Sequence, residues 1–237
     1  MQELMTNIGA NKDLSIATQD NELIEACYSM SLNEKRLLLL VVSKVNSFDF
    51  PNSSDTREFT ITAQEWTEVF GGGNTYRIMK QASIDLMSRT FFLHKKTGHT
   101  KHLSWLMEAD YYDNMGRVSV VFTPKVYARL TGLFHQFTQV NLLCMSQLRS
   151  IHSVRLYELL NQFRSTGYRI IALNDFRFAM DCLDKHELTS ALKRYVLMPA
   201  IKELNKKSDL KVDVNMKRDG RNITHFEFTF SPQSLPQ

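Results

Sequence analysis

Two segments in the second half of the chain carry side chains suited to binding a polyanion. Ser190, Lys193 and Arg194 fall on one face of a predicted helix. A small hydroxyl group beside lysine and arginine supplies donors for the O6 and N7 atoms of guanine and for nearby phosphates. A solvated helix face has the same composition, so this segment alone leaves both interpretations open.

The second segment is a cationic hairpin. Lys217, Arg218 and Arg221 surround Asp219-Gly220, a pair typical of a tight turn between two strands. This charge favours phosphate contact over the solvated-face interpretation. The other candidates for phosphate contact lie near predicted helix starts, where side chains and free amides bind anions: Arg149, Ser150, His152, Ser153 and Lys185.

The first half holds candidate residues with fewer positive charges on one predicted helix, residues 75–89. They are Thr75, Tyr76, Arg77, Lys80 and Gln81. Aromatic residues are frequent between residues 91 and 122, where they fit either a core or an association surface.

Composition indicates a folded chain with its positive charge in one half. Of the 237 residues, 43% are hydrophobic and 23% are charged, which excludes a wholly disordered chain. Residues 1–140 hold 14 Lys/Arg against 15 Asp/Glu, whereas residues 141–237 hold 15 against 10. The three cysteines are far apart, and no apolar run reaches membrane-spanning length. We therefore expect a cytoplasmic protein without a secretory signal.

The sequence contains no catalytic constellation. The run Gly71-Gly-Gly73 lacks the Lys-Ser/Thr ending of a phosphate-binding loop, and there is no His-x-His pair. His94, His99 and His102 lie close together without a carboxylate or cysteine that would complete a metal site. The prediction is a protein that is not an enzyme and has no cofactor or bound metal.

The first half predicts three helices and a set of strands. The patterns Ser31-x-x-Glu34 and Thr62-x-x-Glu65 are capping boxes that start two helices. The third helix, residues 75–89, is followed by strands over 91–95, 103–110 and 118–122. Residues 1–20 lack periodicity and predict a flexible tail.

The second half repeats this plan. Helices are predicted over residues 153–164, 174–180 and 187–207, with Pro199 kinking or dividing the last one, and strands over 210–216 and 222–230 form the hairpin. Arg36 matches Arg155, and Trp66 matches Phe176, at separations between 110 and 119 residues. The fold class is therefore α+β, with two tandem winged-helix domains, each a three-helix core with a β-hairpin wing. The predicted domains are residues 21–137 and 138–237.

Three stretches together are typical of one protein family: Asn21–Leu40, Ser153–Leu160, and Pro199–Asn205 with the hairpin that follows. In them the chain resembles the replication initiators of iteron-containing bacterial plasmids, a family with two tandem winged-helix domains. The resemblance implies that the second domain binds direct repeats in double-stranded origin DNA. The first domain is then expected to mediate homodimerisation and to add DNA contacts.

Further expectations follow from the resemblance. Monomers open the origin and recruit the host replication initiator and the replicative helicase. Dimers bind an operator inverted repeat and repress the protein's own gene. The other function that fits the same residues is a dimeric winged-helix transcriptional repressor without a role in replication. Duplication of the fold within one chain favours the initiator, because a repressor obtains two-fold symmetry by dimerising a single domain.

Overall fold

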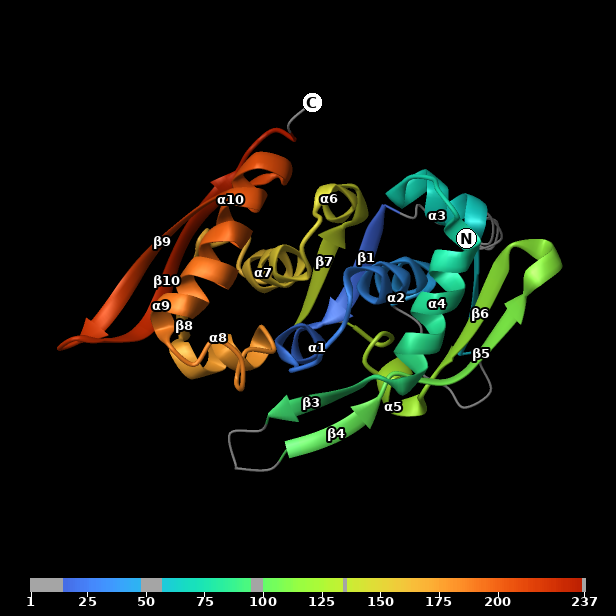
Figure 1. Cartoon of the computed structure of the whole chain (residues 1–237), viewed down its shortest axis with the longest axis horizontal. Helices are drawn as coiled ribbons and strands as arrows, with labels where there is room; N and C mark the ends of the chain where they lie inside the picture. The colour runs from blue at the N-terminus through green and yellow to red at the C-terminus, as the bar shows by residue number, and fades with distance from the viewer. Residues whose placement is uncertain (1–14, 48–56, 95–99, 134–135, 236–237) are drawn as a thin grey trace, which may run out of the picture.

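The computed structural model describes residues 15–47, 57–94, 100–133 and 136–235 (Figure 1). Two units with the same order of elements follow one another, and their three-stranded sheets lie at opposite ends of the long axis. The first unit comprises β1 (Ile16–Asp20), α1 (Asn21–Glu25), α2 (Leu32–Lys44), β2 (Glu58–Thr62), α3 (Ala63–Phe70), α4 (Thr75–Ser88), β3 (Thr90–His94), β4 (Thr100–Ser104), β5 (Leu106–Tyr112), the 3₁₀ turn η1 (Asp113–Met115), β6 (Arg117–Phe122) and α5 (Pro124–Tyr127).

Within the described residues, the second unit repeats this order but has no equivalent of β3, β4, η1 or α5. It comprises β7 (Phe137–Asn141), α6 (Leu142–Gln147), α7 (Ile151–Asn161), β8 (Tyr168–Ala172), α8 (Leu173–Ala179), α9 (Thr189–Leu192), the π turn η2 (Lys193–Leu197), α10 (Met198–Lys207), β9 (Leu210–Asp219) and β10 (Asn222–Pro232).

The two sheets have the same strand order, β2-β6-β5 in the first unit and β8-β10-β9 in the second. In each sheet, the last two strands form an antiparallel hairpin, the wing, which follows the third helix. The predicted single strand over residues 103–110 is wrong. The chain passes at Trp105 from β4, which pairs with β3, to β5, which pairs with β6.

The units meet through their first strands. β1 pairs antiparallel with β7, with Thr18 opposite Gln139. The predicted flexible tail is therefore wrong for Ile16–Asp20, because pairing with a strand far along the chain orders this segment; residues 1–14 lie outside the described residues. The predicted division between residues 137 and 138 falls within β7, and it stays a prediction.

A buried charge network joins the units beside this strand pair. Lys35 of α2 and Glu158 of α7 form an ion pair with 2.7 Å between Nζ and Oε1, and both side chains are fully buried. Gln19 donates to the same carboxylate oxygen at 2.9 Å, and Arg155 donates to Oε2 at 3.3 Å. Tyr28 accepts hydrogen bonds from Lys35 and Arg155. Every charge in the network has a partner, as burial requires.

Local signals in the sequence account for the helix starts. Thr62 and Glu65 form the predicted capping box, with both reciprocal hydrogen bonds present. At Ser31 only half of the box exists: the hydroxyl accepts from the Glu34 amide. The Glu34 carboxylate does not reach back, because it accepts two hydrogen bonds from Arg89, at 2.8 and 3.1 Å.

Pro199 neither breaks nor interrupts the helix of the second unit. The helix runs from α9 through η2 into α10, and the Met198 amide bonds to the carbonyl of Lys193, five residues earlier. The π turn widens the helix where the proline ring would otherwise meet the Tyr195 carbonyl. Lys193 and Arg194 therefore lie in a wide turn rather than in a regular α-helix.

Candidate nucleic-acid interface

The face predicted for base recognition is open to solvent. Ser190 and Arg194 are exposed and Lys193 is half-buried, while Leu192, Val196 and Leu197 hold the helix against the core. Within the described residues, neither cation has a carboxylate within ion-pair distance. Donors without a partner in the protein remain available to an acceptor from outside.

The segment before this helix is partly occupied by its own contacts. Lys185 forms an ion pair with Asp181, with 2.6 Å between Nζ and Oδ2. The ring of His186 stacks on the ring of Tyr195 at a centroid distance of 5.8 Å. Lys185 is exposed, so a phosphate would compete with Asp181 for its ammonium group.

The wing of the second unit presents cations at its tip. Gly220 adopts φ 57°, the left-handed backbone that the turn requires. Arg218 donates to the carbonyl of Arg221 at 3.4 Å, and both side chains are exposed. Lys217 lies 3.4 Å from Glu227, further down the hairpin. The two arginines therefore keep most of their donors free.

Two amides just before α7, in the segment predicted to bind an anion, are engaged by the protein itself. The Glu203 carboxylate of α10 accepts from the Arg149 amide at 3.0 Å and from the Ser150 amide at 3.2 Å. Burial alone would raise the pKa of Glu203, but hydrogen bonds from Lys207 and the Arg149 amide lower it. These two amides are therefore not free, because they already bind a carboxylate that lies 54 and 53 residues away in the sequence.

Two neighbours in this segment are also unsuited to phosphate. The prediction for Ser153 is wrong, because its side chain is fully buried. His152 is half-buried, and its pKa is lowered by burial and by the nearby His186 and Lys185, so the neutral ring is favoured. The side chain of Arg149 is exposed, and its role stays a prediction.

The candidates on α4 divide between two faces. Tyr76 and Lys80 turn toward the wing of their own unit and donate to the same oxygen of Asp113, at 2.7 and 2.8 Å. These two hydrogen bonds lower the pKa of Asp113. Thr75 donates to the Gly73 carbonyl at 2.7 Å. With Gln81, which donates to Asp85, four of the five candidates already have partners within the unit.

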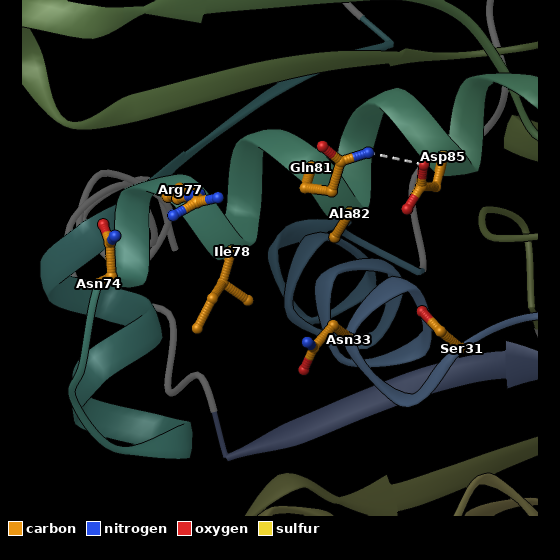
Figure 2. Close-up of a pocket in the computed structure, with 8 residues that line it drawn as sticks. All are labelled: Ser31, Asn33, Asn74, Arg77, Ile78, Gln81, Ala82 and Asp85. Atoms are coloured by element: carbon orange, nitrogen blue, oxygen red, sulfur yellow. Dashed lines mark hydrogen bonds between the residues drawn. The ribbon is translucent and has the colours of Figure 1, made fainter.

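Arg77 and Gln81 lie on the other face, above a groove between α4 and the start of α2 (Figure 2). The groove has a volume of about 340 Å³, and Gln81 donates to Asp85 at 2.9 Å along its rim. It is lined by Ser31, Asn33, Asn74, Arg77, Ile78, Gln81, Ala82 and Asp85. Arg77 is exposed there, and among the described residues it has no ion-pair partner.

The structure adds apolar side chains that sequence reasoning did not include. Leu188 is 72% exposed at the N-cap of α9, and Tyr195 and Met198 are exposed further along the same helix. In a major groove, apolar side chains contact the methyl group of thymine. The sequence signal was present, because these residues lie outside the apolar stripe formed by Leu192 and Val196.

Other kinds of site find no support in the described residues. They contain no group of three His, Cys, Asp or Glu side chains placed to hold a metal ion. Nor does any helix of the described segments combine the length and the apolar character needed to cross a bilayer.

Comparison with known proteins also gives two winged-helix domains, WH1 and WH2. The family model described as initiator replication protein, WH1, matches residues 16–161, and its WH2 counterpart matches residues 172–230. The chain belongs to the initiator replication protein family. The predicted fold of two tandem winged-helix domains is thereby confirmed.

Individual relatives cover most of this initiator family member. An uncharacterised 27.6 kDa protein of Escherichia coli is 30% identical over 226 residues, 89% of this chain and 93% of that protein. A replication initiation protein of Escherichia coli is 23% identical over 205 residues, 83% of this chain and 64% of that protein. The crystal structure of the Pi initiator protein in complex with iteron DNA has a TM-score of 0.77 at 21% identity, covering 94% of this chain and 99% of that one.

Proposed function

We propose that this protein initiates plasmid replication by binding repeated origin DNA, the iterons, mainly through its second unit. The observation that carries the proposal is the exposed face of α9 and η2, where Lys193 and Arg194 have no carboxylate partner among the described residues. Such cations are available to phosphates and base edges. Family membership and the fold shared with the Pi initiator, which binds iteron DNA, support the same ligand.

The two units have different roles in this proposal. Ser190, Lys193 and Arg194 contact base edges, while Arg218 and Arg221 on the wing contact phosphates. The first unit adds contacts through Arg77 and mediates homodimerisation. Monomers open the origin and recruit the host initiator and replicative helicase, and dimers repress the protein's own gene at an inverted repeat. The protein acts in the cytoplasm, without a catalytic step of its own.

Binding across a salt series tests the DNA-binding part. Six to ten phosphate contacts lower the affinity by roughly 10³–10⁵ between 50 and 200 mM salt. Arg221→Ala is expected to weaken binding to repeat DNA and to random DNA alike, and to reduce the slope of log K against log salt by about one. Fluorescence anisotropy on both duplexes measures this. A slope near zero for the wild type would falsify the DNA-binding role.

The remaining candidate function is a repressor that binds DNA but does not support replication. Initiator and repressor use the same contacts, so binding data do not separate them. A complementation experiment does: the protein is supplied in trans to a replicon that lacks its initiator gene. Maintenance of that replicon supports the initiator, whereas repression of a promoter reporter without maintenance supports the repressor. Sedimentation of the same preparations measures the dimer.

A further inference from the structure

Arg177 of α8 is a buried cation with an unusual set of partners. Its side chain is 8% exposed. One terminal nitrogen donates to the carbonyls of Cys182, Lys185 and His186, at 3.2, 3.4 and 2.9 Å. The other donates to the Glu187 carbonyl at 2.8 Å. Every one of these acceptors is backbone of the turn between α8 and α9.

The other buried cations of the described residues are neutralised differently. Lys35 and Arg155 pair with Glu158, and Arg169 pairs with Glu25. Arg177 has no carboxylate within ion-pair distance in the described part of the chain, so carbonyl dipoles alone stabilise its charge. A guanidinium has five donors in a rigid fork, which lets one side chain bind several carbonyls at fixed angles.

The turn that Arg177 binds is strained at both ends. Asp181 has φ 54° and His186 has φ 55°, left-handed conformations that side-chain-bearing residues rarely adopt. Such conformations persist only where the surrounding contacts fix them. The hydrogen bonds from Arg177 span this segment and end one residue before Leu188, the N-cap of α9. Since α9 begins directly after this turn, the turn positions the start of the helix that carries Ser190 and Arg194.

We propose that Arg177 is a positioning residue for DNA recognition. Its buried guanidinium holds the turn between α8 and α9 in one conformation. The exposed face of Ser190 and Arg194 is then presented to the major groove at a fixed angle. This inference rests on the proposed function. It assigns specificity to a residue that does not itself touch DNA.

Arg177→Lys tests this role, with Arg169→Lys as the matched control. Lysine keeps the charge, but its single nitrogen cannot reach carbonyls spread along the turn. Arg169 is about equally buried, at 7%, and also donates to backbone, the Leu159 carbonyl. Its partners lie in and just after α7 and in α1, not in the turn before α9. The specific duplex is the one that the wild type enriches from a randomised library, and the comparison duplex is its shuffled sequence.

For Arg177→Lys, the ratio of specific to shuffled affinity should fall by about tenfold, comparable to losing one good base contact, while shuffled-DNA affinity stays unchanged. Arg169→Lys should keep the ratio. An unchanged ratio in Arg177→Lys, or equal losses in both variants, overturns the positioning role. A wild type that does not distinguish the two duplexes contradicts the proposed function itself.

Hydrogen exchange on the wild type keeps the inference testable if Arg177→Lys does not fold. The Cys182 amide, which donates to the Arg177 carbonyl, and the amides of Ala191 and Leu192, which donate to the Leu188 carbonyl, should exchange as slowly as those of the buried helix α7. Fast exchange in this turn would show that Arg177 does not fix it, and would overturn the proposal.

Discussion

The two wings carry opposite charge although they occupy equivalent places in equivalent sheets. The tip of β5–β6 holds Asp113, which binds Tyr76 and Lys80 of its own recognition helix. The tip of β9–β10 holds Arg218 and Arg221, which have no carboxylate partner among the described residues. The two units share a backbone plan but not a surface. One unit satisfies much of its own charge, and the other leaves its charge for a ligand.

Two equivalent arginines in the interface between the units, Arg155 and Arg36, also differ in burial and in their partners. Arg155 is buried and donates to Glu158, to Tyr28 and to the carbonyls of Ala26 and Ala179. Arg36, its counterpart on α2, is half-buried and donates to two carbonyls of the second unit, Ser146 and Leu148.

The largest expected effect is on stability, when Arg155 and Arg36 are replaced one at a time. Arg155→Met removes a member of a buried charge network and is expected to lower the free energy of unfolding by about 3–5 kcal/mol. Arg36→Met removes hydrogen bonds near solvent and is expected to cost about 1 kcal/mol. Urea denaturation of both variants measures the difference. Equal losses would mean that the two positions are energetically equivalent, against the structure.

The next effect concerns the recognition helices. Arg194→Ala should weaken binding to the specific duplex by about 1–3 kcal/mol and narrow its advantage over random DNA. Lys80→Ala should change either affinity by about 0.5 kcal/mol or less, because its exposed ion pair with Asp113 already engages the ammonium group. Titrations with both duplexes compare the variants. If Lys80→Ala weakens binding to the specific duplex more than Arg194→Ala does, the first unit makes the principal contacts to DNA.

Much of the fold follows from local signals in the sequence. The capping box at Thr62, the Asp219-Gly220 turn and the alternation along β9 and β10 depend on neighbouring residues, and these predictions match the structure. The exposed face of Ser190 and Arg194 follows from helical periodicity in the same way.

The features that sequence reasoning missed depend on residues far apart in the chain. β1 is a short polar segment that becomes a strand only by pairing with β7. The amides before α7 lose their anion site to Glu203, which arrives from α10. The strand pattern runs through Trp105 without a break, although the chain changes sheets there. Tertiary pairing decides each of these cases, and periodicity does not record it.

A smaller effect on affinity tests whether an exposed apolar side chain of the second unit, Leu188, contacts a thymine methyl group. Replacing each thymine of the specific duplex by deoxyuridine removes one methyl group, worth about 0.8 kcal/mol when buried. We expect one such position to weaken wild-type binding but not that of Leu188→Ala. Leu183→Ala is the control, because Leu183 is 49% exposed in the preceding turn rather than at the N-cap of α9. Footprint-resolved titrations identify the position. Uniform sensitivity in all three proteins would remove Leu188 from the interface.

The smallest effect tests whether Asp113 on the first unit's wing keeps Lys80 from binding phosphate. Asp113→Asn removes the carboxylate that engages Lys80 and Tyr76, so the ammonium group becomes available to phosphate. The slope of log K against log salt should then steepen by about one, on specific and random DNA alike. Asp110→Asn is the matched control, because it removes the same charge from the same hairpin without releasing a cation. If both variants steepen the slope equally, the wing acts only through its overall charge. If Asp113→Asn alone does so, the difference between the two units lies in one carboxylate, and a single substitution makes the first unit more like the second.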